Sequence, residues 1–237
     1  MKKVILFVSV LSLLTFSCSK EDEIVLPDSE LTDYGLDVIN YFKEVALGFE
    51  FGEASKITRR WNNDMKIYVG GNPTSELLSE LDIIVKDING LTASGFSVEI
   101  VNDSVQSNFY IHFGSGASYS EIFPSQSNLI DSNWGLFTIF WNGSSELYTG
   151  YMYVDIFRAN SIEQKHLLRE ELTQSLGLAR DSFLYSESIF QQAFSTKVIE
   201  YSKIDKDLIR LLYHPKMSVG LSANQVDGVL RNILLEE

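Results

Sequence analysis

The sequence predicts an α+β protein in which a sheet-forming region is followed by a smaller helical C-terminal part. Three observations predict it. Short segments that alternate apolar and polar residues recur between residues 65 and 156, as expected for half-buried strands. Several longer segments place apolar residues at steps of three and four, as expected for helices with one buried face. After residue 203 only the helical pattern remains.

The N-terminal half contains two expected helices. Thr32 or Asp33 can cap a helix that runs to about Leu47, because either side chain can accept hydrogen bonds from the first turn. A second and stronger helix is expected from about Thr74 to Leu91, where leucine and isoleucine recur on one face. Each of these helices is therefore expected to bury one side against a sheet or another helix.

The expected strands are short and are separated by turn residues. They lie at residues 65–69, 96–100, 108–113, 136–141 and 147–156. Asn142-Gly143 favours a tight hairpin between the last two strands. The long polar segment between the third and fourth strands, residues 114–133, is expected to be a loop, and its glycine-rich start at residues 114–117 is expected to be flexible.

The C-terminal third predicts three helices. Residues 161–164, Ser-Ile-Glu-Gln, have the spacing of a capping box and begin a helix that runs to about Leu176. A second helix covers about Ile204 to Tyr213 and ends before Pro215, because proline disfavours helical geometry in the residue before it. A last helix begins with a capping box at residues 222–225.

The first 17 residues are expected to be a lipoprotein signal peptide. Lys2 and Lys3 precede an apolar run, residues 4–16, which is too short to cross a bilayer. The run ends at a segment, residues 15–18, that is similar to the bacterial lipobox, in which the cysteine becomes lipidated. The alternative is a free cysteine with cleavage elsewhere. Because Cys18 is the only cysteine, it has no partner for an intramolecular disulfide.

The mature chain is expected to consist of a lipidated tether and one domain. Residues 18–30 form the tether, and the acidic stretch at residues 19–23 resembles the surface-export signal of Bacteroidetes lipoproteins; the alternative is a plain solvated linker. The domain is expected to cover residues 31–237, with an upper lobe to about residue 178 and a lower lobe after it. We therefore expect an outer-membrane lipoprotein, with its cell-surface exposure left open.

The charge of the chain excludes several partner classes. The formal net charge is −13, and loss of the first 17 residues, which hold two lysines and no acid, makes the remainder more negative still. Nucleic acids and anionic lipid headgroups both require a positive surface. We expect no nucleic-acid partner, and contact with the membrane through the lipid anchor only.

The most informative motif lies in the helix that begins near residue 161. Its spacing is that of the zincin pattern His-Glu-x-x-His-x-x-Gly, in which histidines on one helix face bind zinc and the glutamate is the general base. Glu171 occupies the general-base position, and Gly177 occupies the position of the turn. Glu170, Gln174 and Arg180 stand where the three histidines would be.

This motif, together with Asp181-Ser182 and Leu212-Tyr213-His214-Pro215, resembles a family of bacterial proteins in the zincin-like clan, many of them predicted lipoproteins. The resemblance covers most of residues 31–237. It implies a twisted mixed sheet that packs against two long helices, with a smaller helical C-terminal lobe. It also implies that Leu136–Trp141 is the edge strand beside a cleft.

The resemblance implies a set of site residues around that cleft. Glu171 would be catalytic only if the protein is an active enzyme. Met217 would lie in a methionine-containing turn beneath the site, with Tyr213 near it. The expected cleft residues are Glu170, Gln174, Arg180, Asp181, Tyr213 and Met217.

The residues at the histidine positions favour a site without zinc. A primary amide is a poor zinc ligand, and a guanidinium stays protonated and cannot bind a metal at all. We expect no cofactor, with an ion pair between Arg180 and Glu170 or Glu171 in place of the metal. The alternative for Arg180 is a surface position near the helix C-terminus, where the helix dipole favours a cation.

The three histidines leave a second metal hypothesis open. His166 lies four residues before Glu170, so both share a helix stripe, and together with His214 they could bind zinc in an unconventional site. The simpler interpretation is that His166 is a surface residue and His214 a turn residue. His112 alternates with apolar residues in an expected strand and is most simply structural.

Three functions remain from the sequence. The leading hypothesis is a surface lipoprotein whose degenerate peptidase cleft binds a polypeptide or another envelope ligand without cutting it. Such binding would use strand addition at the edge of the sheet. The second is an active metal-dependent peptidase with Glu171 as base and unusual ligands, so enzymatic activity is left undecided. The third is a structural subunit of an outer-membrane complex.

Overall fold

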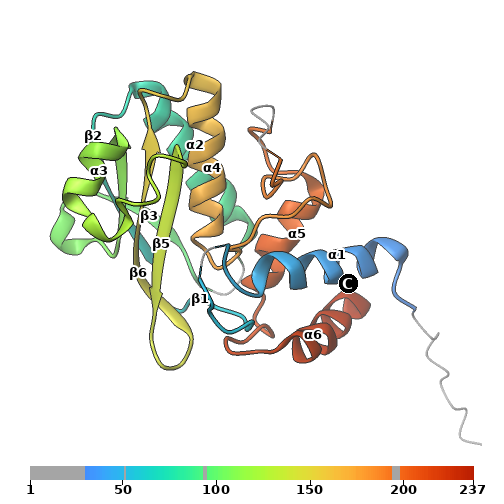
Figure 1. Ribbon diagram of the computed structural model, residues 1–237. Helices are drawn as coiled ribbons and strands as arrows, with labels where there is room; N and C mark the ends of the chain where they lie inside the picture. Colours follow the sequence, from blue (N-terminus) through green and yellow to red (C-terminus); the bar gives the residue numbers. More distant parts are fainter. Residues whose placement is uncertain (1–29, 51, 93–94, 194–197) are drawn as a thin grey trace, which may run out of the picture. The chain divides into compact units, whose positions relative to one another are not determined.

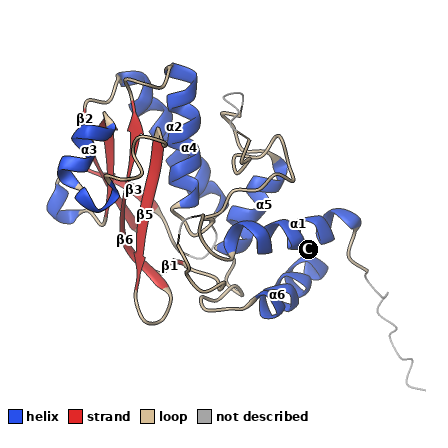
Figure 2. Cartoon of the chain, viewed as in Figure 1, coloured by secondary structure: helices blue, strands red, loops and turns tan. Residues whose placement is uncertain are grey.

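A mixed sheet separates the helices of the domain into groups. The computed structural model describes residues 30–50, 52–92, 95–193 and 198–237. Helices α2 (Ser75–Leu91) and α4 (Ser161–Gln174) lie on one face of the sheet, and the short helix α3 (Gly116–Ile122) lies on the other (Figures 1 and 2). The predicted signal peptide, Cys18 and all but the last residue of the tether lie outside the described residues.

The sheet has one antiparallel strand, and that strand forms its edge. The order is β1-β6-β4-β2-β3, with β5 paired to β6. All pairings are parallel except that between β5 and β6. The strands are β1 (Arg60–Trp61), β2 (Met65–Gly71), β3 (Val98–Val101), β4 (Phe109–Gly114), β5 (Gly135–Trp141) and β6 (Glu146–Asp155). The predicted fold class, a mixed sheet with two long helices and a smaller helical lobe, is confirmed.

The core lies between the sheet and the two long helices. Alternate residues of the central strands, such as Ile67 in β2 and Ile111 in β4, are fully buried together with the apolar stripe of α2. Three leucines at steps of four, two on α4 at positions 168 and 172 and one just after it at position 176, are also fully buried. Burying one such side chain stabilises the fold by about 1.5 to 3 kcal/mol, so this face of α4 fixes the helix on the sheet.

The helical lobe is formed by α1 (Asp33–Ala46), α5 (Lys203–Leu212) and α6 (Ala223–Glu236). Helix α1 packs against both α5 and α6, and in Figure 1 these three helices lie beyond α4 from the sheet. The capping residues predicted at Thr32 and Ser222 occupy their expected positions. The N-cap of α4 is Asn160, which forms a capping box with Glu163. Ser161 is therefore the first residue of the helix, and the predicted capping box at residues 161–164 lies one residue too far along the chain.

The polar segment between β4 and β5 is not the loop that the sequence predicted. It contains helix α3 and the 3-10 turn η2 (Pro124–Gln126), and another such turn, η1 (Ser104–Gln106), precedes β4. Ser115 caps α3 by accepting a hydrogen bond from the Ser118 amide. The helix is seven residues long, too short for a periodic signal, and it is held by the fully buried Tyr119, whose ring stacks on Tyr153 with centroids 4.5 Å apart.

The C-terminal end of α4 is closed by side chains from two other elements. The indole Nε1 of Trp61 in β1 donates to the Ser175 carbonyl at 2.9 Å, and the Tyr213 hydroxyl after α5 donates to the Leu176 carbonyl at 3.0 Å. The next residue, Gly177, has a φ of +115°. A side chain at Gly177 would also overlap the Arg59 carbonyl oxygen, so only glycine lets the chain leave α4 here.

We predict that Gly177→Ala lowers the free energy of unfolding by about 2 to 4 kcal/mol, because it adds backbone strain and a steric overlap. Urea denaturation followed by circular dichroism measures the effect. Gly228→Ala, in an exposed turn of α6 with open space around it, is the control and is expected to gain up to about 1 kcal/mol. Equal effects of the two substitutions would contradict this account of the α4 terminus.

Candidate functional site

Helix α4 buries five polar or charged side chains on the side that does not carry its leucines. These are His166, Arg169, Glu171, Thr173 and Gln174. In the simpler interpretation of the sequence, His166 was expected at the surface. That expectation was wrong, because His166 is only 2% exposed. The segment after α4 folds back over this side of the helix, which no periodic pattern in α4 itself could reveal.

Four of the five buried side chains have hydrogen-bond partners. Arg169 donates to Glu80 and Asp87 of α2, at 3.0 and 2.9 Å, and Thr173 is bonded to the Arg169 carbonyl and the Tyr201 hydroxyl. His166 Nδ1 lies 2.6 Å from the Val198 carbonyl oxygen and its Nε2 lies 3.3 Å from a Glu170 carboxylate oxygen. Gln174 donates its amide to Asp181. These contacts pair most of the polar atoms of the four side chains, as buried polar groups require, and the Arg169 Nε is left without a partner.

Glu171 is the exception. Its side chain is 8% exposed, and its carboxyl group has no hydrogen-bond partner among the described residues. It lies against the edge strand, where a Cβ atom on Gly135 would come within 2.6 Å of its Oε1. Burial, followed by the charges of Glu170, Asp181 and Glu50, raises the pKa of Glu171 well above its usual range. Its surroundings therefore favour the protonated form of this carboxyl group over the ionised form.

Glu171 lines two neighbouring cavities. The first, which we call the acid cavity, has a volume of about 570 Å3 and is bounded by four carboxyl groups, by His166 and by several side-chain amides. The carboxyl groups are those of Glu50, Glu170, Glu171 and Asp181. The second, which we call the strand cavity, has a volume of about 410 Å3 and runs beside residues 135–139 of β5. The two share Glu50, Asn133, Gly135 and Glu171, so they adjoin one another.

The acid cavity is walled by a loop with its own internal bonds. Ser182 and Gln191 form a parallel bridge, and the Ser182 amide donates to the Phe190 carbonyl at 2.8 Å. Asp205, fully buried at the start of α5, accepts hydrogen bonds from Ser188 and from the Ile189 amide. The loop that carries Asp181 is therefore fixed to the helical lobe as well as to α4.

The carboxyl groups of the acid cavity raise one another's pKa values. Burial first, and then the charges of Glu170 and Glu50, raise the pKa of Asp181 to about 7. Burial and the Glu170 charge also raise the pKa of Glu50. Burial alone would lower the pKa of His166, but its hydrogen bond and charge interaction with Glu170 outweigh this, so the net shift is upward. The cavity thus concentrates negative charge with one histidine as its basic group.

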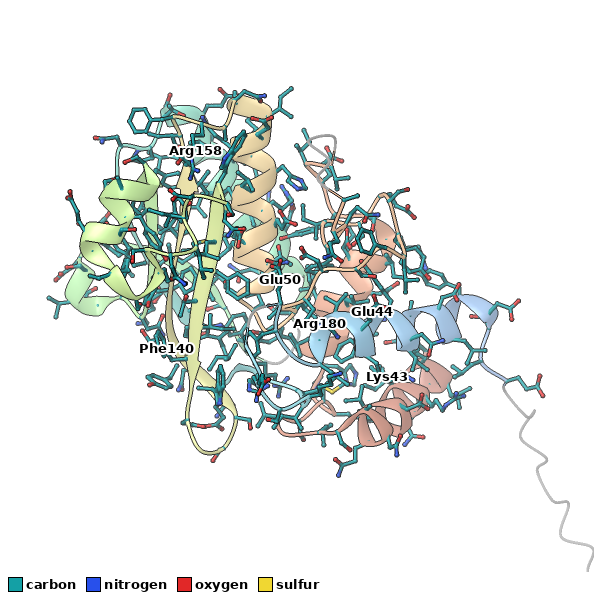
Figure 3. All side chains as sticks on the ribbon, in the orientation of Figure 1. Lys43, Glu44, Glu50, Phe140, Arg158 and Arg180 are labelled. Carbon is teal, nitrogen blue, oxygen red and sulfur yellow. The ribbon has the colours of Figure 1, made fainter. Side chains whose placement is uncertain are left out.

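Three other predicted site residues lie elsewhere. Arg180 points toward α1, where its Nη1 donates to the Glu44 carbonyl at 3.4 Å (Figure 3). The predicted ion pair with Glu170 or Glu171 is therefore not formed. Tyr213 and Met217 are fully buried in the hydrophobic core, and neither lines the acid cavity or the strand cavity. Tyr213 supports the site indirectly, through its bond to the end of α4.

Glu50 is a site residue that the sequence did not predict. It follows α1 in a polar stretch that carries no motif, and its amide donates to the Ala179 carbonyl at 3.1 Å. Figure 3 shows it near the C-terminal end of α4. Contacts between residues this far apart in the chain leave no signal in a single sequence, so only the folded chain brings Glu50 to Glu171.

The side chains at the expected ligand positions do not fit zinc. The Gln174 amide is engaged by Asp181 and the Arg180 guanidinium is directed away, as described above. His214 is a turn residue whose Nδ1 accepts a hydrogen bond from the Lys216 amide at 3.1 Å, so the weaker triad of His166, Glu170 and His214 is not assembled. Within the described residues, no three His, Cys, Asp or Glu side chains are grouped as a metal site would require.

Comparison with known families identifies the family to which the chain belongs. A family model described as "Protein of unknown function (DUF2927)" matches residues 36–232. The chain belongs to the DUF2927 family. This match spans most of the domain predicted at residues 31–237.

Comparisons with individual proteins add only a distant likeness. No curated protein matches the DUF2927 chain. Among solved structures, Myroilysin matches with 12% sequence identity and a TM-score of 0.40, over 66% of this chain and 82% of that one. A likeness of this size assigns no activity to the DUF2927 chain. In the described part of the chain, no helix has the length and apolar character needed to cross a bilayer.

We predict that Asp181→Asn stabilises the protein at alkaline pH. With a folded-state pKa of about 7 against an ordinary value of 3.8, Asp181 keeps a proton that the unfolded chain loses. Its contribution to stability is therefore complete below pH 4 and is lost as the pH rises through 7. The variant should exceed the parent by about 1 to 3 kcal/mol at pH 8 and differ little at pH 4.

Urea denaturation at both pH values measures this difference. Asparagine preserves an oxygen acceptor for Gln174, so the comparison isolates the charge. Glu121→Gln, on the exposed side of α3, is the control and should change stability by less than about 0.5 kcal/mol. A variant that is less stable than the parent at pH 8 would show that Asp181 is not destabilised by its surroundings.

Proposed function

We propose that this DUF2927 protein is a non-catalytic pseudo-peptidase that binds an extended polypeptide along β5 without cutting it. The observation that carries the proposal is the unpaired edge of β5 beside two adjoining cavities. We further propose that Cys18 carries a lipid anchor and that the protein is displayed at the outer membrane. The degenerate motif around Glu171 would then be what remains of a zincin active site.

The edge strand supplies the main-chain groups that strand addition needs. On one side β5 pairs with β6, and on the other no strand is paired to it in the described residues. Residues 135–139 line the strand cavity in an unbroken run. An unpaired strand edge exposes a row of N–H and C=O groups that an extended peptide can use.

The strand cavity also offers apolar surface for the side chains of a bound peptide. Phe49 and Trp141 stack with ring centroids 5.1 Å apart at one end of the cavity. The Arg59 guanidinium lies over the Trp141 ring at 4.4 Å and holds this pair in place. Aromatic rings fixed in this way present contact area at a low cost in conformational entropy. Main-chain bonds would give affinity, and these pockets would select side chains.

The proposal excludes cutting because the catalytic groups are unsuited to it. A general base must be ionised to take a proton from water, and the raised pKa of Glu171 disfavours its ionised form. The amide and guanidinium at the expected ligand positions supply no metal site.

The alternative is a metal-dependent peptidase with Glu171 as general base. One observation favours it, namely that Glu171 lies directly beside Gly135 of the edge strand, as a base acting on a strand-bound peptide would. Mass spectrometry of peptides incubated with the protein and zinc decides between the two. Cleavage that Glu171→Gln abolishes, with peptide affinity unchanged, would support the alternative and overturn our proposal.

Strand addition makes a specific prediction for a peptide probe. The tightest binder from a library of unstructured ten-residue peptides should slow amide hydrogen exchange in residues 135–140, because its main chain covers the β5 edge. In an added strand only alternate N–H groups face the partner. Methylation of alternate peptide nitrogens should therefore weaken binding by at least about tenfold in one register and by much less in the other.

Two results would contradict the proposed function. One is a library in which no peptide binds with a Kd below about 1 mM, the weak limit of useful recognition. The other is binding without slower exchange in β5, or with equal sensitivity to methylation in both registers. The exposed residues 142–144 of the hairpin turn are an internal control for exchange, because the proposed peptide does not reach them.

A further inference from the structure

We propose that the acid cavity is a recognition site for an organic cation, an ammonium or guanidinium group. In a bound polypeptide this group would be the side chain of a lysine or arginine that enters the cavity at the Gly135 end of β5. As a pocket for a polypeptide the inference rests on the proposed function, whereas the cation chemistry itself does not.

The first support for the proposal is that the acid cavity contains acidic side chains without a lysine or arginine to balance their charge. Four carboxyl groups, those of Glu50, Glu170, Glu171 and Asp181, line the cavity, and no lysine or arginine is among its described lining residues. His166 is the basic group present, and it is committed to Glu170. A cation that enters would therefore meet at least two carboxyl groups without a basic partner.

The second support is the unsatisfied Glu171. Each of the four other buried polar side chains of α4 has a partner within the protein, as described above, although the Arg169 Nε has none. The Glu171 carboxyl lines the cavity with no hydrogen-bond partner in the described part of the chain. Leaving a buried polar group unpaired has a free-energy cost. A hydrogen-bond donor on a ligand would remove this cost. The unpaired Glu171 is thus an observation separate from the cluster of acidic residues, and it indicates a ligand with a donor group.

The size and lining of the cavity select an organic cation over a metal ion. A metal such as calcium needs six to eight oxygens within about 2.3 to 2.6 Å, and the described residues contain no group of three acidic or imidazole ligands arranged in that way. The volume of about 570 Å3 suits the end of a long side chain. Amides of Asn133, Gln191 and Gln192 line the same cavity and can orient an N–H donor group.

The position of the cavity connects it to the peptide-binding edge. It shares Gly135 and Glu171 with the strand cavity, so the two cavities adjoin at this end of β5. Arg180, which directly precedes Asp181, is bonded to the Glu44 carbonyl, and Arg169, which directly precedes Glu170, is bonded to Glu80 and Asp87 of α2. No lysine or arginine of the described residues therefore lines the place proposed for the ligand.

Single-residue probes test the cation chemistry without requiring strand addition. The probes are Nα-acetyl-arginine methylamide and Nα-acetyl-lysine methylamide, with the citrulline and norleucine analogues as their neutral counterparts. Isothermal titration should give each cationic probe at least about a tenfold lower Kd than its neutral counterpart, with a preference that falls as salt is raised. Butylammonium, spermidine and calcium chloride serve as further probes of a free amine, a polyamine and a metal.

Variants assign the preference to the cavity. The double variant Glu171→Gln with Asp181→Asn should reduce the preference for the cationic probes to less than about threefold, because it removes the carboxyl groups while keeping their shape. It is expected to fold, since both substitutions remove groups that are costly to ionise when buried. Glu121→Gln, on the exposed side of α3, removes one carboxyl group outside the cavity and should leave the preference unchanged.

Each outcome either supports or overturns the inference. Cationic probes that bind with the expected preference support it, and weaker binding of the free amines than of the amino-acid amides identifies a polypeptide side chain as the source. Equal binding of free amines supports the cation site with a small-molecule ligand. Equal affinity for charged and neutral probes, or binding of calcium alone, overturns it. Peptides that protect β5 but show no preference for basic residues overturn the inference and leave the proposed function intact.

Discussion

The structure depends on the burial of both sides of α4. One side carries leucines that pack on the sheet, and the other carries polar groups that are covered by the loop after the helix. Polar groups cost free energy when they leave water unless they find partners. The contacts of His166, Arg169, Thr173 and Gln174 therefore determine where α2, the loop and the helical lobe can sit. These contacts hold α4, and therefore Glu171, in position, although Glu171 forms none of them.

The fixed position of Glu171 explains the electrostatics of the site. A carboxyl group that is held among other carboxyl groups and away from solvent is more stable with its proton. The same burial raises the pKa values of Asp181 and Glu50, which approach Glu171 from the loop and from the segment after α1. Three separate elements thus contribute acids to one cavity. The folded chain stores unfavourable interactions there that a bound donor would relieve.

The arrangement separates scaffold from chemistry. The antiparallel edge strand β5 lies beside helix α4, whose sequence has the spacing of a zincin motif. This arrangement of strand and helix requires only apolar faces, a glycine at the end of the helix and no further strand beyond β5. The chemistry of a metal site needs particular donors at particular distances, and these are absent from the expected positions in the described residues. The proposed binding of a peptide requires only the arrangement of strand and helix and no metal ligands.

The sequence by itself determined the elements with a strong local signal. The apolar stripes of α2 and α6, the alternating strands and the leucines of α4 follow from periodicity, which each segment carries on its own. Helix α3 and the two-residue β1 escaped prediction because they are too short to show a period. The location of the acid cavity along α4 followed from the spacing around Glu171, which local geometry also fixes.

Only the tertiary structure decided which residues surround Glu171. It buried His166, directed Arg180 to the Glu44 carbonyl, and brought Glu50 to a cavity with Asp181. These outcomes depend on contacts between residues far apart in the chain, whose energies are set by the packing of whole elements. A residue's own neighbours in sequence carry no record of such contacts, so a single sequence predicts which groups are available but not which of them meet.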